Sequence, residues 1–118
     1  MKPFSIDYVE PKEGPEGVVD VFVSGFLDAH TVVTFESALN DLLERKYQKF
    51  IIDLEGLSYI SSAGIGALMV LLQQLRRRQG DMVLFQPSPK VFKLLELLGF
   101  NKVFTIVHQR EDAVAKLG

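Results

Sequence analysis

The sequence contains no cysteine, and this absence removes several classes of chemistry. A chain without thiols has no disulfide framework, no thiol nucleophile and no thiolate metal site. No apolar run is long enough to cross a bilayer, so we expect no membrane insertion. The first residues also lack the apolar segment and small-residue cleavage site of a secretory signal, which makes a cytoplasmic location the expectation.

The chain also lacks the excess of basic residues that nucleic-acid binding requires. Its 13 lysine and arginine residues are outnumbered by 15 acidic residues, which gives a formal net charge of −2. Contacts with phosphate groups demand a basic face, so we expect no direct nucleic-acid partner. With 118 residues, 47% of them hydrophobic, the chain has the size and composition of one globular domain over residues 1–118.

Most catalytic arrangements are missing as well. His30 and His108 are far apart in sequence and neither belongs to a pair with metal-ligand spacing, so we interpret both as surface or capping residues. The sequence has no nucleophile elbow and no phosphate-cradling loop ending in Gly-Lys-Ser/Thr. We therefore expect no enzyme activity, no metal and no cofactor.

Hydrophobic periodicity predicts alternating strands and helices over most of the chain. The expected strands cover residues 4–9, 18–23, 50–54, 82–85 and 102–107. The expected helices cover residues 29–45, 62–78, 89–98 and 110–117. Asp28 is predicted to cap the first helix and Ser88 the third, while Gly25 is predicted to allow a bulge.

The connections between these segments predict the topology. The first two strands are joined by a short turn-rich segment, residues 10–17, which is too short for a crossover helix and favours an antiparallel hairpin. From residue 27 onward strands and helices alternate, which predicts parallel strands with right-handed crossovers. The expected fold class is α/β, a mostly parallel mixed sheet with an N-terminal antiparallel hairpin packed against about four helices.

The most informative stretch is a buried strand over residues 50–54, a short loop, and the helix that starts near residue 62. The core-facing stripe of this helix is predicted to contain Ile65, Leu68, Leu72 and Leu75.

The opposite side of the same helix is small and partly apolar. Ser62, Ala63, Gly66 and Val70 fall on this side, whereas Gly64 lies inward, where close packing against the sheet accounts for it. A glycine in a helix costs about 1 kcal/mol relative to alanine, so the outward Gly66 needs another explanation. A smooth, partly apolar surface beside a hydroxyl group is typical of a docking site for another protein.

A phosphate on Ser62 or Ser61 would act as a switch at this surface. It would add about −1.5 to −2 charges, which the helix N-terminus would stabilise within the domain. The same charge would oppose docking, because it must lose water to enter an apolar interface. A serine at a helix start is otherwise a cap, and the residues alone leave both interpretations open.

Acidic residues at the end of a predicted strand, at a helix start and in a loop form a second candidate site. Asp28, Asp53 and Glu55 are expected near one edge of the sheet. This edge is a candidate binding site because ligands of open α/β sheets bind at the carboxyl ends of strands. Capping or solvation is the alternative interpretation for each of these residues.

Three stretches resemble the STAS domains, and in particular the stand-alone anti-sigma factor antagonists. They are Val-Ser-Gly-Phe-Leu-Asp (residues 23–28), Ile-Ile-Asp-Leu-Glu-Gly-Leu-Ser-Tyr-Ile-Ser-Ser-Ala-Gly-Ile-Gly-Ala-Leu (51–68) and Pro-Lys-Val-Phe-Lys-Leu-Leu-Glu-Leu-Leu-Gly-Phe (89–100). The resemblance extends through nearly the whole chain and implies the STAS fold.

The resemblance also implies partner switching in bacterial transcription regulation. An unmodified antagonist of this family binds a serine kinase/anti-sigma factor of the histidine-kinase-like ATPase fold and makes it release a sigma factor or another target. The kinase phosphorylates the antagonist at the start of the helix described above, and a metal-dependent serine phosphatase reverses this. The antagonist is a substrate and a binder, with Ala63, Gly66, Val70, Asp28 and Asp53 as its expected partner-binding residues here.

This sequence departs from the family pattern Asp-Ser-Ser/Thr-Gly, in which the phosphoacceptor directly precedes the glycine. Aligned on Gly64, the acceptor position is Ala63, and Ser61 replaces the aspartate. Ser62 is therefore our first choice as the acceptor, and Ser61 the second.

Two other functions remain open. One is a STAS scaffold or regulatory subunit of a transport complex, working without phosphorylation, which Ala63 favours. The other is nucleotide binding at the edge formed by Asp28, Asp53 and Ser61.

Overall fold

The computed structural model describes residues 3–118, and within them the chain forms six strands and four α-helices. The strands are β1 (Ser5–Val9), β2 (Val18–Leu27), β3 (Lys49–Asp53), β4 (Leu57–Ile60), β5 (Asp81–Phe85) and β6 (Ile106–Val107). The helices are α1 (Val32–Glu44), α2 (Ser62–Arg77), α3 (Pro89–Leu97) and α4 (Arg110–Leu117), with a 3₁₀ turn at Phe100–Lys102. None of the helices in this described part is long and apolar enough to span a membrane.

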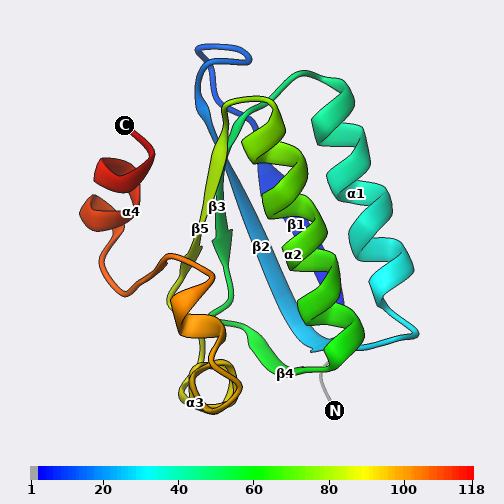
Figure 1. Cartoon of the computed structure of the whole chain (residues 1–118). Coiled ribbons are helices and arrows are strands. Elements are labelled where there is room, and N and C mark those ends of the chain that lie inside the picture. Colours follow the sequence, from blue (N-terminus) through cyan, green and yellow to red (C-terminus); the bar gives the residue numbers. More distant parts are fainter. Residues whose placement is uncertain (1–2) are drawn as a thin grey trace.

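The strands form one mixed sheet in the order β1-β2-β3-β5-β6, with β4 paired to the end of β2 (Figure 1). Strand β1 is antiparallel to β2, and all the other pairs are parallel. The predicted α/β class, with its N-terminal hairpin, parallel remainder and about four helices, is confirmed.

The two faces of the sheet are covered by different helices. Helices α1 and α2 pack on one face, where Phe50 and Ile52 of β3 belong to the main core (Figure 1). Ile51 points to the other face and packs with Ala113 and Leu117 of α4. Because side chains alternate along a strand, Asp53 also lies on the α4 side of β3.

The segment between β3 and α2 was expected to be a loop, and this expectation is wrong. Residues Leu57–Ile60 form β4, which continues the sheet beside the last part of β2. This is possible because β2 runs ten residues, to Leu27, rather than ending near residue 23. Gly25 has a φ of 86° and the register shifts beside it, so the predicted bulge is confirmed.

The last predicted strand is largely wrong. Only Ile106–Val107 pair with β5; Lys102 ends the 3₁₀ turn Phe100–Lys102, and residues 103–105 form an irregular turn. Phe104 is buried in the main core and its ring lies 6.0 Å from that of Phe100. The apolar residues of this segment therefore pack a turn against the core and do not form a strand.

Capping residues behave partly as predicted. The carboxylate of Asp28 accepts hydrogen bonds from the N–H groups of His30 (2.9 Å) and Thr31 (3.0 Å), although α1 itself begins only at Val32. Ser88 is the N-cap residue of α3 and Pro89 follows at the first helical position, as predicted, but the Ser88 hydroxyl makes no capping hydrogen bond. The hydroxyl instead donates to the carbonyl of Leu57 at 2.7 Å and ties the start of α3 to β4.

Candidate functional site at the start of helix α2

Ser61 is the N-cap of α2. Its backbone is extended (φ −93°, ψ 174°), and its hydroxyl oxygen accepts a hydrogen bond from the N–H of Gly64 at 3.3 Å. Its own N–H donates to the carbonyl of Leu27 at 2.9 Å, which fixes the helix start to the end of β2. The hydroxyl of Ser61 is therefore engaged in holding the first turn of the helix.

Ser62 is the first residue of α2 and its side chain is exposed. Within residues 3–118 its hydroxyl takes part in no hydrogen bond. The unpaired N–H groups of the first helical turn lie at this position and carry partial positive charge. The two serines thus have different environments: one hydroxyl caps the helix, and the other is accessible from solvent.

The inward side of α2 matches the predicted core stripe. The four residues expected there, Ile65, Leu68, Leu72 and Leu75, are all buried. Gly64 is buried too, and a Cβ atom there would lie 2.8 Å from Cγ of Leu27 and 2.9 Å from Cγ1 of Ile60. Close packing of α2 against β2 and β4 therefore requires glycine at this position.

The outward side of α2 also lies as predicted. A Cβ atom at Gly66 would meet nothing within 4 Å, so no packing in the described chain explains this glycine. Val70 is 48% exposed and Ala63 is partly exposed.

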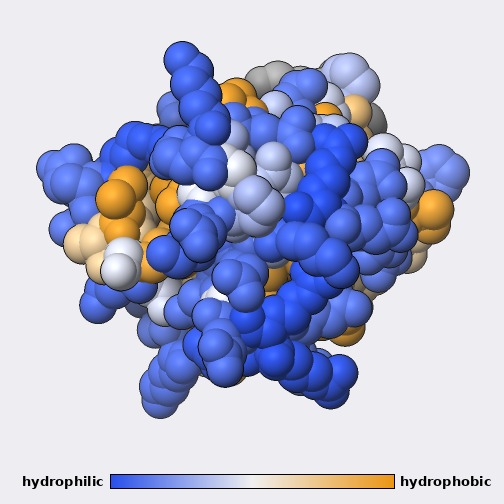
Figure 2. Space-filling model, turned by 90° about the horizontal axis from the view of Figure 1, so that it is seen from above, coloured by the Kyte–Doolittle hydropathy of each residue, from blue (hydrophilic) through white to orange (hydrophobic). Residues whose placement is uncertain are grey.

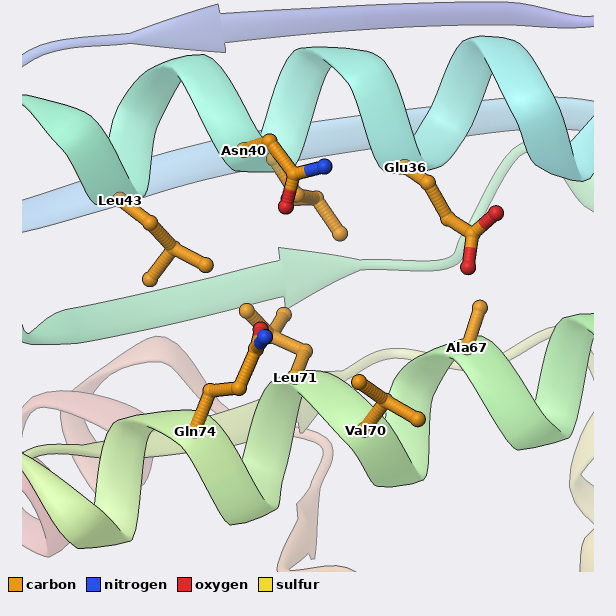
Figure 3. A pocket seen from close by; sticks show the side chains of 8 residues that line it. Glu36, Asn40, Leu43, Ala67, Val70, Leu71 and Gln74 are labelled. Carbon is orange, nitrogen blue, oxygen red and sulfur yellow. The ribbon is translucent and has the colours of Figure 1, made fainter.

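Val70 stands at the border between this outward side and a shallow groove that separates α2 from α1. Figure 3 shows Ala67, Val70 and Gln74 on α2, opposite Glu36 and Asn40 on α1. The α2 side of the groove is mainly apolar near Val70, whereas the α1 side contributes a carboxylate and an amide besides Leu39 and Leu43.

Asp28 lies at the same end of the molecule as Ser61 and Ser62, because its neighbour Leu27 is hydrogen-bonded to Ser61. The hydrogen bond from the Thr31 N–H, with a further one from His30, holds the pKa of the Asp28 carboxyl below its ordinary value despite some desolvation. Asp28 is therefore a carboxylate at neutral pH, directed at its own turn.

Asp53 does not join Asp28, contrary to the expected acidic edge. Its register partner on β2 is Phe22, well before the end of that strand. At a rise of about 3.3 Å per residue, the positions of Asp53 and Asp28 are on the order of 15–20 Å apart along β2. The extension of β2 beyond β3 separates them, and the edge proposed for nucleotide binding is not formed.

Asp53 has a different set of neighbours. Its carboxylate accepts a hydrogen bond from the N–H of Glu55 at 2.9 Å, so these two residues do lie together. Arg110 at the start of α4 pairs with Asp20 at 2.8 Å. Burial raises the pKa of Asp53 and the negative charges of Glu55 and Asp20 add to this, whereas the hydrogen bond from the Glu55 N–H and the charge of Arg110 lower it.

Asp53→Asn is expected to stabilise the fold at neutral pH. Because the folded state raises the pKa of Asp53, its carboxylate weakens folding once the pH is above that raised value, while asparagine keeps the acceptor for Glu55. Below the ordinary value of 3.8 both states bind the proton, and the difference should vanish. Urea unfolding of both proteins from pH 3 to pH 8 measures this, and an unchanged or larger gain at low pH would contradict it.

Both histidines are exposed, as expected. His108 lies edge-on against Phe92, with ring centroids 5.3 Å apart. No group of three or more histidine, aspartate or glutamate residues in the described part of the chain could hold a metal ion.

Sequence patterns missed an exposed apolar strip beside this site. Phe26 and Tyr59 are exposed on β2 and β4, with ring centroids 5.7 Å apart, and Leu97 is exposed on α3. The segment that contains Tyr59 was taken for a loop, so its alignment with β2 was not expected.

The fold and the site define a small α/β domain: a mixed sheet, helices on both faces, and a helix start with an exposed serine at its first position. Residues 11–113 match the STAS domain family. The chain belongs to this family, and stand-alone anti-sigma factor antagonists are homologous to it over most of its length.

Individual relatives show the extent of this similarity. The anti-sigma-B factor antagonist of Listeria monocytogenes is 34% identical over 98 residues, which cover 83% of this chain and 86% of the relative. A solved anti-sigma factor antagonist from Mycobacterium paratuberculosis has a TM-score of 0.78 and 24% identity, covering 96% of this chain and 94% of that one. The antagonist SpoIIAA in its unphosphorylated form has a TM-score of 0.72 and 23% identity, covering 93% of this chain and 92% of that one.

Proposed function

We propose that this chain, as one STAS domain over residues 1–118, is an anti-sigma factor antagonist that acts by partner switching in bacterial transcription regulation. Unphosphorylated, it binds a serine kinase/anti-sigma factor of the histidine-kinase-like ATPase fold. Phosphorylation of Ser62 by that kinase breaks the complex, and a metal-dependent serine phosphatase restores binding. The chain is a binder and a substrate, and catalysis belongs to its partners.

The observation that carries this proposal is the different environment of the two serine hydroxyl groups. Ser61 uses its hydroxyl as the cap of α2, which leaves Ser62 with an exposed hydroxyl at the first helical position. A phosphate there is stabilised by the helix N-terminus, so the modification is compatible with the fold. This supports Ser62 over Ser61 although the usual acceptor position holds Ala63.

The surface beside Ser62 supports the binding half of the proposal. Gly66 has open space around it, Val70 is 48% exposed and Ala63 is partly exposed, so this surface is small, partly apolar and open to a partner. Asp28 is at the same end and belongs to the proposed contact surface. A contact with Asp53 would require the partner to reach the α4 side of the sheet.

The test is a kinase reaction read by mass spectrometry. Each serine kinase of this ATPase class from the source organism is incubated with ATP and the wild-type chain, Ser62→Ala or Ser61→Ala. We expect one phosphate on Ser62 of the wild type and none on Ser62→Ala. The Ser61→Ala protein should still accept phosphate at Ser62, provided that it remains folded by circular dichroism. A wild-type chain that takes no phosphate at either serine would rule out the switch.

A scaffold role in a transport complex is the second candidate, and Ala63 is the observation that favours it. Such a role needs no modifiable residue at the start of α2. Co-purification of the tagged chain with an ATP-binding cassette transporter, with no kinase retained, would decide for this function.

A further inference from the structure

The end of the molecule that carries Ser62 also carries an apolar groove. The groove lies between β4 and α3 and is lined by Tyr59, Leu94 and Leu97, with Lys90 and Lys93 at its rim. Leu97 is 74% exposed, and Phe26 extends the apolar surface through its contact with Tyr59. Exposed apolar patches rimmed by polar residues mark interaction sites.

The groove is continuous with the proposed switch. Tyr59 and Ile60 line it, and the next two residues are Ser61 and Ser62. Figure 1 shows α3, β4 and the start of α2 together at one end of the fold. The opposite end, seen in Figure 2, is covered mainly by hydrophilic residues. One partner placed on the start of α2 therefore meets the groove without crossing the molecule.

The groove is also held in place by the fold. The Ser88 hydroxyl fixes the start of α3 to the carbonyl of Leu57, and Val91 and Leu95 anchor the inner side of α3 in the core. The groove therefore exists before any partner binds, which lowers the entropic cost of association.

Its size and charge indicate the kind of occupant. The cavity measures about 270 Å³, below the roughly 300–1,000 Å³ of ordinary small-molecule pockets, and suits one or two inserted side chains. No acidic residue lines the groove, and within residues 3–118 neither Lys90 nor Lys93 forms an ion pair. The complementary occupant is aliphatic with carboxylates beside it.

We propose that this groove is a second contact for the kinase/anti-sigma factor and takes an aliphatic side chain of that partner flanked by acidic residues. The inference rests on the proposed function. The two contacts have separate roles: the groove selects the partner and supplies affinity, while the charge at Ser62 sets whether the complex persists.

The test compares Leu97, the last residue of α3, with Leu98, the C-cap residue that follows it. Leu97 lines the groove, whereas Leu98 is 56% exposed but does not line it, so Leu98→Ala is a matched control for Leu97→Ala. Likewise Lys93→Glu reverses a charge at the rim, and Lys102→Glu makes the same change outside it. Each unphosphorylated full-length variant is titrated calorimetrically with the kinase that binds the wild-type chain, and its folding is checked by urea unfolding.

We expect Leu97→Ala to weaken binding about tenfold or more, as truncation of a buried anchor residue does. Lys93→Glu should weaken it by a similar factor, because the new carboxylate would face the carboxylates of the partner. The two controls should stay within about twofold of the wild type. Equal binding by all four variants, with Ser62→Glu still deficient, would overturn the groove contact and leave the proposed function intact. Failure of the wild type to bind any kinase would overturn both.

Binding to lipid is the other outcome that would overturn the proposal. An acyl chain with an anionic headgroup shares the chemistry of the proposed occupant. If the wild-type chain sediments with phosphatidylglycerol vesicles and Leu97→Ala does not, while kinase affinity is the same for both, the groove is a lipid site.

Discussion

Ser62→Glu is expected to weaken binding to the kinase at least tenfold, which corresponds to about 1.4 kcal/mol. Ser62 is exposed beside Ala63, Gly66 and Val70, so a carboxylate there must lose water when the partner covers this surface. The fold should tolerate the change, because an acidic side chain in the first turn of α2 interacts favourably with the helix dipole. Calorimetric titration of the kinase with the unphosphorylated proteins measures the effect.

The matched control for this variant is Gln73→Glu. Gln73 is exposed on the same helix but lies beyond the first two turns. The substitution therefore introduces the same charge on α2 at a distance from Ser62. Ser62→Ala should bind like the wild type, because the hydroxyl has no partner in the described structure. If Ser62→Glu binds within about twofold of Gln73→Glu, charge at Ser62 does not control the interface.

Alanine substitutions at the two glycines of α2 are expected to change stability in opposite directions. At Gly64 a new methyl group would lie 2.8 Å from Leu27 and 2.9 Å from Ile60, and such overpacking lowers the free energy of unfolding by about 1–3 kcal/mol. At Gly66 the methyl group meets nothing, so the gain in helix propensity should raise the free energy of unfolding by about 0.5–1 kcal/mol. Urea unfolding of the three proteins gives both differences.

The pair also tests what Gly66 is for. If the partner packs closely against the outward side of α2, Gly66→Ala should be more stable than the wild type and yet bind the kinase less tightly. A Gly66→Ala protein that is no more stable than the wild type would contradict the open surroundings of this residue. Unchanged affinity in a stabilised variant would remove Gly66 from the proposed contact surface.

The sequence predicts best those elements whose signal is local. The buried stripe of α2 repeats at helical spacing, and the apolar runs of β3 and β5 mark strands covered on both sides, so these elements are found in place. Strand β4 has only four residues, and what makes it a strand is its distant partner, the last part of β2. A pattern read along the chain carries no information about that partner.

In the candidate site, too, the features that are local in sequence were predicted and those that depend on distant contacts were not. Ser61, Ser62, Gly64 and Gly66 are close in sequence, so helical geometry alone predicts which of them point outward. Asp28 and Asp53 were expected together because Asp53 ends one predicted strand and Asp28 starts the helix that follows another. Their separation depends on the length of β2 beyond β3. The groove between β4 and α3 depends on a contact between residues far apart in sequence, such as the hydrogen bond from Ser88 to Leu57, which are 31 residues apart.

The most direct test of partner switching compares the chain before and after phosphorylation by its own kinase. The two forms are separated, the phosphate is located by mass spectrometry, and each form is titrated into the same kinase under identical conditions. The proposed function predicts that the unmodified chain binds and that the Ser62-phosphorylated chain binds at least tenfold more weakly. Equal affinity of the two forms would contradict it.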